Sequence, residues 1–193
     1  MLKQFGARHI ALIAGLSALS AVTQLNHIGY QSPTWGMWID FVAVFWIVAF
    51  FLYGLRMSLL VSFIGAIIIA LFAPDTWLGA LMKLIATLPL IFSLGGWLSV
   101  NKNSKIEKYK NILSLVAPLV IGILLRCLVV LPVNYYFALP IWTKMTTAQA
   151  WQAIPWYIIA GFNIVQSLID ILVAWILVYK FKLDRYANSS EKL

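Results

Sequence analysis

Two apolar runs joined by one short turn decide the fold of this chain. Residues 54–100 read GLRMSLLVSFIGAIIIALFAPDTWLGALMKLIATLPLIFSLGGWLSV, with Ala73-Pro74-Asp75 between the runs. Only Arg56, Asp75 and Lys83 carry charge in this stretch. Each run approaches the roughly 20 apolar residues that cross a bilayer as a helix. The stretch therefore predicts a hairpin of two transmembrane helices.

The rest of the chain has the same character. Of its 193 residues, 63% are hydrophobic and 10% are charged, whereas an ordinary soluble domain has about 25% charged residues. We therefore predict an all-α, polytopic membrane protein that forms a single domain over residues 1–193. Apolar runs and turn signals predict six transmembrane helices, at about 8–25, 37–53, 57–73, 77–99, 111–139 and 156–180. Pro118 and Pro132 predict a kink in the fifth helix, or an irregular segment near Asn134.

Basic residues indicate the orientation in the membrane. Eleven of the 14 lysines and arginines fall at the termini and in the second-to-third and fourth-to-fifth connections. The positive-inside rule then places both termini in the cytoplasm, in a multi-pass protein of the plasma membrane. The net charge of +8 therefore reports topology, and we expect no nucleic-acid partner. Ala18-Leu19-Ser20 resembles a signal-peptide cleavage site, but cleavage there would preserve the orientation of the remaining helices.

Four ionisable residues lie within or at the ends of the predicted spans. Asp40 and Lys83 are close to the outer ends, whereas Arg126 and Asp170 are each roughly 20 Å deep at the helical rise. An unpaired charge at a helix centre costs roughly 2.5–3.5 kcal/mol on insertion scales. We therefore predict two pairs, Asp40 with Lys83 and Arg126 with Asp170. Packing alone explains both pairs, but Lys83 lies among small and polar residues and is also a candidate for binding.

Aromatic and amide side chains gather at the predicted outer ends. Six of the nine tryptophans lie there, and this excess suits a stacking site for a flat aromatic ligand. Anchoring at the membrane interface explains much of the same pattern. Amides add donors and acceptors for the edge of a heterocycle, or bond helices to one another. The candidate substrate-binding residues are Trp38, Asp40, Lys83, Asn134, Tyr135, Trp151, Asn163 and Gln166.

Small residues recur along the first helix. Ala11, Ala14, Gly15 and Ala18 follow the spacing of one helical face. Small side chains let a second helix approach closely. The pattern suits either packing within this chain or docking of a separate membrane subunit.

Motifs for catalysis and for metal binding are missing from the sequence. It contains no phosphate-binding loop, no H-E-x-x-H or G-x-S-x-G motif, and no cysteine-histidine cluster. His9 and His27 lie at opposite ends of one predicted helix and cannot share a metal ion. We therefore expect no cofactor, no metal and no means of using ATP within this chain.

Several segments together resemble a transporter family. They are GALMK at 79–83, LPVNYYFALP at 131–140, FNIVQ at 162–166 and the Ala14-x-x-x-Ala18 pattern. With six helices in under 200 residues, the chain resembles the substrate-binding S component of an energy-coupling factor (ECF) vitamin transporter, nearest to the riboflavin type. Gln166 departs from that type, whose members carry a lysine three residues after the sixth-helix asparagine.

The resemblance implies a function and partners. An S component binds a vitamin near the extracellular face, and a transmembrane coupling subunit with two cytoplasmic ATPases drives uptake. The resemblance assigns Ala14 and Ala18 to the coupling surface, and Lys83, Asn134 and Asn163 to the neighbourhood of the ligand. We therefore expect a binding subunit rather than an enzyme, which captures a small aromatic vitamin such as riboflavin. We expect the 140–155 loop to cover the ligand with Trp142 and Trp151.

Two other functions remain open at this point. The four ionisable residues would suit a membrane enzyme that acts on lipid, although their spacing forms no known catalytic motif. The polar residues would equally suit a structural or assembly subunit in which they hold helices together.

Overall fold

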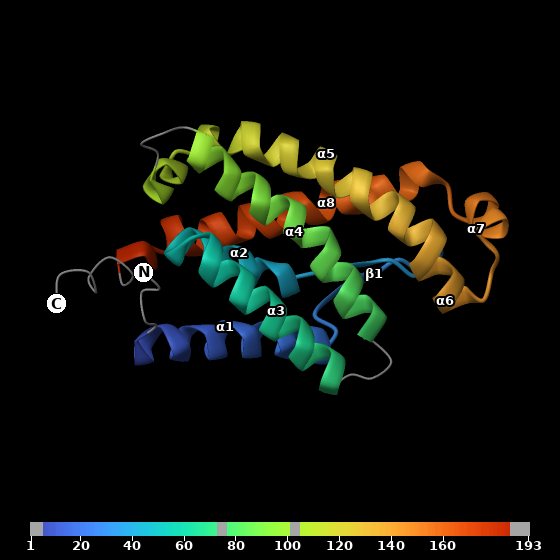
Figure 1. The fold of residues 1–193 in the computed structure, drawn as a ribbon, viewed down its shortest axis with the longest axis horizontal. Helices are drawn as coiled ribbons and strands as arrows, with labels where there is room; N and C mark the ends of the chain where they lie inside the picture. Colours follow the sequence, from blue (N-terminus) through green and yellow to red (C-terminus); the bar gives the residue numbers. More distant parts are fainter. Residues whose placement is uncertain (1–5, 73–76, 101–104, 186–193) are drawn as a thin grey trace.

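The computed structural model describes residues 6–72, 77–100 and 105–185. Within these ranges, six apolar helices form one bundle (Figure 1). They are α1 (Ala7–Leu25), α2 (Val42–Tyr53), α3 (Leu55–Phe72), α4 (Trp77–Val100), α5 (Val116–Val133) and α8 (Trp156–Trp175). The prediction of a helical membrane protein is therefore confirmed.

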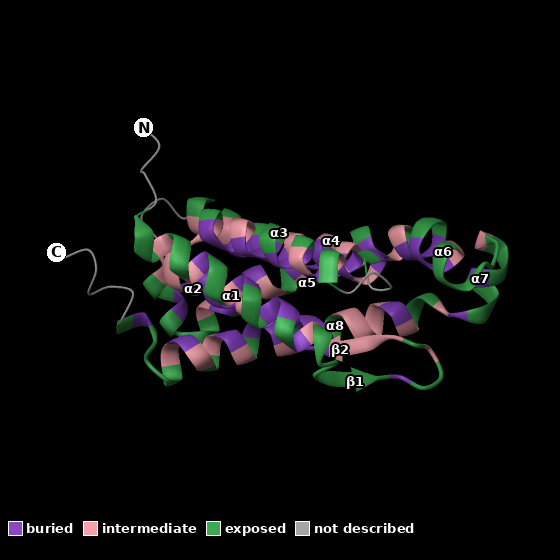
Figure 2. Ribbon diagram, turned by 90° about the horizontal axis from the view of Figure 1, so that it is seen from below, coloured by how far each residue is buried: buried purple, intermediate pink, exposed green. Residues whose placement is uncertain are grey.

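Five segments of this bundle are long and apolar enough to cross a membrane. They are Ala7–Leu25, Leu55–Phe72, Trp77–Val100, Ile112–Thr143 and Trp156–Lys180. Their outward surfaces carry large apolar side chains, such as Leu71 and Leu128 (71% and 70% exposed), as contact with lipid requires. Figure 2 shows such exposed surface along most helices, with α2 in the interior. The chain is thus a multi-pass membrane protein.

The second predicted helix, 37–53, is wrong at its start. Residues 38–40 form the strand β2 (Trp38–Asp40), which pairs antiparallel with β1 (Gly29–Gln31), and α2 begins only at Val42. The Asp40 carboxylate accepts a hydrogen bond from the Val42 amide (2.9 Å) and so satisfies a free donor at the start of α2. With 12 residues, α2 is shorter than the roughly 20 residues of a membrane span.

The fifth predicted helix, 111–139, differs at both ends. Two 3₁₀ turns, η2 (Ile106–Lys110) and η3 (Ile112–Leu115), precede α5. Beyond Val133 the helix continues through the π-helical turn η4 (Asn134–Ala138) into α6 (Leu139–Thr143). The irregular segment predicted near Asn134 is confirmed, and it follows Pro132, which lacks an amide hydrogen for the helical ladder.

The remaining elements complete the two ends of the bundle. A short helix, α7 (Thr147–Ala153), follows α6, and a π-helical turn, η5 (Ile176–Lys180), extends α8. Helix α3 begins directly after Gly54, which has φ of 85°, two residues earlier than predicted. The predicted Ala73-Pro74-Asp75 turn lies outside the described residues.

Figure 1 separates the two ends clearly. The β1–β2 hairpin, α6 and α7 lie at one end, and the start of α1, η2 and η5 lie at the other. The second end, where α3 also begins, carries a group of basic residues: Arg8, Arg56, Lys105, Lys108, Lys110, Lys180, Lys182 and Arg185. Lys3, Lys102 and Lys192 also belong to the predicted cytoplasmic set but lie outside the described residues. The cytoplasmic orientation of this basic end stays a prediction.

Candidate binding site

A cavity of about 450 Å³ opens at the hairpin end of the bundle. Its walls come from the β1–β2 hairpin, α4, the α5–η4–α6 segment and α8. This volume lies within the range of roughly 300–1,000 Å³ that is usual for small-molecule sites. Six of the eight candidate substrate-binding residues line the cavity: Trp38, Asp40, Lys83, Asn134, Asn163 and Gln166.

The other two candidates, Tyr135 and Trp151, stack on each other instead. Their ring centroids are 3.9 Å apart at an interplanar angle of 7°. Tyr135 is fully buried, and its hydroxyl donates to the Ile154 carbonyl (2.6 Å). This contact fixes α7 against η4 behind the cavity wall. Of the two tryptophans expected to close over a ligand, Trp142 lines the cavity, whereas Trp151 does not.

The hairpin forms much of the cavity's cover. Trp35 and Met37, between β1 and β2, pack onto a buried cluster of α4, α5 and α8 side chains. Gly36 has φ of 64°, and its amide donates to the Ser32 carbonyl (2.9 Å), which closes the turn. Met37 was not expected at the cavity, and Trp35 was expected only as one of the six tryptophans at the outer ends. The turn signals Pro33 and Gly36 were visible, but the apolar run that follows favoured a helix.

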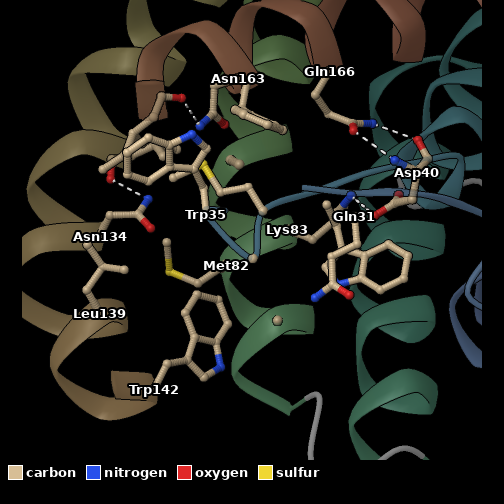
Figure 3. Close-up of a pocket in the computed structure, with 18 of the residues that line it drawn as sticks. Gln31, Trp35, Asp40, Met82, Lys83, Asn134, Leu139, Trp142, Asn163 and Gln166 are labelled. Carbon is tan, nitrogen blue, oxygen red and sulfur yellow. Dashed lines mark hydrogen bonds and ion pairs between the residues drawn. The ribbon is translucent and has the colours of Figure 1, made fainter. Parts of the chain in front are cut away.

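The predicted pair of Asp40 and Lys83 is confirmed. The Lys83 ammonium donates to Asp40 Oδ2, while Asp40 Oδ1 accepts from the Val42 amide. Both charged side chains line the cavity, and Figure 3 shows them together on one side of it. The pair therefore fixes β2 to α4.

Gln166 joins the hairpin to α8. Its Oε1 accepts from the Asp40 amide (3.0 Å), and its Nε2 donates to the Asp40 carbonyl (2.8 Å) and to Asp170 Oδ1 (2.7 Å). Both amide hydrogens are thus in use. A lysine at this position would have no acceptor for the Asp40 amide. The glutamine therefore fits this network where the riboflavin-type lysine would not.

The predicted pair of Arg126 and Asp170 is also confirmed. Arg126 Nη1 lies 3.4 Å from Asp170 Oδ2, and Arg126 Nε donates to Asn163 Oδ1 (2.8 Å). Both charged side chains are buried. With the contacts of Gln166 and Asp40, these bonds form one continuous polar network from Lys83 to Asn163.

Comparison with solved structures shows which fold holds this cavity. The "S component of a bacterial ECF transporter" superposes with a TM-score of 0.70, covering 94% of this chain and 96% of that one, at 22% sequence identity. This chain has the fold of an S component. No protein-family model and no curated protein sequence matches the chain. The similarity concerns the fold, so the ligand has to be inferred from the cavity itself.

Within this S-component fold, the small residues of α1 do not serve internal packing. Ala11, Ala14, Gly15 and Ala18 are all exposed, and a Cβ added at Gly15 would meet no atom within 4 Å. The buried face of α1 is a different one, formed by Ile13, Ser17, Ser20, Ala21 and Thr23. Ser17 donates from this buried face to the Val61 carbonyl of α3 (3.2 Å). The small-residue face is therefore free to meet another molecule.

The S-component cavity holds a mixed set of chemical groups. Amide side chains and the charged side chains of Asp40, Lys83 and Arg126 supply polar groups, and tryptophan and methionine side chains supply flat or adaptable apolar surface. Within the described ranges, no group of three or more His, Cys, Asp or Glu residues could hold a metal ion. The arrangement can bind an organic molecule through stacking and hydrogen bonds.

Proposed function

We propose that this chain is the membrane-embedded, substrate-binding subunit of an ECF importer. Its substrate is a small aromatic vitamin, with riboflavin among the candidates, captured at the extracellular face. The observation that carries the proposal is the cavity of about 450 Å³, lined by tryptophans and amides, within an S-component fold. A subunit used only for assembly has no need of such a cavity.

The charge distribution supports capture from outside. Eight of the eleven described basic residues gather at the end of the bundle opposite to the cavity, whereas Lys83, Arg126 and Lys144 do not (Figure 1). Basic residues near membrane spans favour the cytoplasmic side. The cavity would then open to the extracellular face of the plasma membrane.

The exposed face of α1 supports a partner subunit. We infer that Ala11, Ala14, Gly15 and Ala18 contact a transmembrane coupling subunit, which two cytoplasmic ATPases drive. Small side chains let such a partner's helix approach closely within the bilayer. Energy from outside the chain is required, because its sequence contains no nucleotide-binding motif.

Thermal unfolding of the detergent-purified chain tests the proposal. The panel consists of riboflavin, flavin mononucleotide (FMN), thiamine, folate, biotin, pantothenate and nucleobases. A ligand at a hundredfold excess over its Kd stabilises the folded state by about 2.7 kcal/mol, so one compound should raise the Tm with concentration. Mass spectrometry of co-purified small molecules extends the search beyond the panel. No shift and no co-purified compound would contradict the proposal.

A matched pair of asparagines separates binding from folding. Asn134 lines the cavity and Asn26 does not, yet each donates through Nδ2 to the carbonyl four residues earlier, both at 2.9 Å. Asn134→Ala should reduce the ligand-induced shift, whereas Asn26→Ala should leave it intact. Equal losses in both variants would show that the amides act only through the helices.

A further inference from the structure

Arg126 combines deep burial with access to the cavity. Only 3% of its side chain is exposed, yet it is one of the residues that line the cavity. The pair with Asp170 explains why a charge is tolerated at this depth. It does not explain why Arg126 also borders the cavity.

Not every N–H donor of the Arg126 guanidinium forms a hydrogen bond. Arginine has five N–H donors. Nε donates to Asn163 and Nη1 to Asp170, but Nη2 makes no hydrogen bond to any residue in the described ranges. In the described ranges, Trp46 Nε1 is the one side-chain nitrogen or oxygen that is fully buried and has no hydrogen-bond partner. Arg126 Nη2 also has no partner, but it is not among the fully buried atoms. Nη2 is therefore not enclosed by protein, and the space that Arg126 reaches is the cavity.

The charges around the cavity cancel. Among the described lining residues, Lys83 and Arg126 are positive and Asp40 is negative, while Asp170 lies directly behind Arg126. Each positive group thus has a carboxylate partner, with His27 counted as neutral. A ligand with a net charge would lose its hydration and find no uncompensated opposite charge.

Asn134 provides an unused hydrogen-bond acceptor, which complements the unused donor of Arg126. Its Nδ2 donates to the Val130 carbonyl, and its Oδ1 makes no hydrogen bond within the described part of the chain. Figure 3 shows Asn134 across the cavity from Lys83, with Asn163, the partner of Arg126, on an adjoining wall. The cavity therefore presents an unused donor and an unused acceptor to one ligand.

We propose that Arg126 is a ligand-binding residue that donates from Nη2 to an uncharged acceptor, a ring carbonyl or ring nitrogen. In this charge-balanced cavity the ligand is a heterocycle without net charge, which also offers an N–H group to Asn134. The inference rests on the proposed function and deepens it, because it names the class of substrate.

The first test uses ligands that differ in charge. Riboflavin and FMN differ by one phosphate, and thiamine provides a cation. Their affinities are measured by titration of the full chain in lipid nanodiscs. The uncharged member should bind at least about tenfold more tightly than its phosphorylated partner. Equal or tighter binding of FMN would overturn the inference while leaving a substrate-binding subunit in place.

The second test uses variants that change the charge or the donor alone. Asp40→Asn leaves Lys83 uncompensated and retains an oxygen for the Val42 amide, so relative affinity should shift toward FMN. The double variant Arg126→Gln/Asp170→Asn keeps the balance of charge and removes Nη2. It should bind riboflavin at least about tenfold more weakly without gaining affinity for FMN.

The outcomes of these tests are distinct. Unchanged riboflavin affinity in Arg126→Gln/Asp170→Asn would overturn the role of Arg126. Unchanged selectivity in Asp40→Asn would overturn the charge argument even where the double variant fails to fold. If no compound of any charge binds, and none co-purifies with the wild-type chain, the proposed function fails and this inference fails with it.

Discussion

The two ion pairs of the cavity lie at different depths. In the Asp40–Lys83 pair at the rim, the side chains keep 6% and 14% exposure, whereas Arg126 and Asp170 keep 3% and 0%. The rim pair fixes a hairpin that covers the cavity. The deep pair places a charge-balanced donor at the cavity wall. With the proposed role of Arg126, the two pairs of one network have different tasks, since the rim pair holds the cover and the deep pair contacts the ligand.

Breaking the deep pair gives the largest expected effect. Asp170→Ala leaves the Arg126 charge buried and unpaired, and should lower the free energy of unfolding by about 3–5 kcal/mol. Adding Arg126→Leu removes that charge, so the double variant should be more stable than Asp170→Ala alone. Thermal unfolding in detergent measures both. A double variant as unstable as the single one would show that the two side chains are not coupled.

Removing Gln166, which links the two ion pairs, should lower the free energy of unfolding somewhat less than breaking the deep pair does. Gln166→Leu leaves the Asp40 amide and carbonyl without their partners and should destabilise the chain by about 2–3 kcal/mol. The hairpin should also exchange its amide hydrogens faster. Gln152→Leu, on the exposed surface of α7, is the control and should change stability by less than about 0.5 kcal/mol. Unchanged exchange in the hairpin would contradict the role of Gln166.

Breaking the rim pair should have a smaller effect on stability. Asp40→Ala should cost about 1–2 kcal/mol, because the Lys83 side chain keeps 14% exposure, against 3% for Arg126, and so retains more contact with water. Hydrogen exchange in the β1–β2 ladder should rise. The surface pair of Lys110 and Asp184, 2.8 Å apart, provides a control, since Lys110→Ala should leave this exchange unchanged. A cost for Asp40→Ala equal to that for Asp170→Ala would remove the distinction between rim and deep pairs.

The smallest expected effect is on ligand affinity, and it should differ between Trp142→Ala and Trp151→Ala. Trp142→Ala removes an indole from the cavity lining and should weaken binding of the identified ligand several-fold, by about 1 kcal/mol. Trp151→Ala removes the stacking partner of Tyr135 and should reduce stability more than affinity. Titration and thermal unfolding of both variants give the two quantities. A larger loss of affinity in Trp151→Ala would favour the original expectation that Trp151 covers the ligand.

The sequence predicted both ion pairs because depth along an apolar run follows from counting residues. It missed β2, although the pairing of β2 with β1 is local, because the apolar run that follows favoured a helix. The hydrogen bonds that hold β2 to α8 join Asp40 and Gln166, which are 126 residues apart, and no local pattern predicts them. The same holds for Tyr135, whose ring meets Trp151 only once η4 and α7 are packed. Arg126 was assigned to packing because its unused donor becomes visible only when each N–H is matched with its partner.

Native mass spectrometry of the full chain in nanodiscs tests the central claim most directly. The protein is incubated with an equimolar mixture of riboflavin, FMN, thiamine, folate, biotin and pantothenate. A charge-balanced cavity predicts one complex at a 1:1 ratio with an uncharged aromatic compound, and its loss in Arg126→Gln/Asp170→Asn. A dominant complex with an anionic or cationic compound, or no complex at all, would contradict the account.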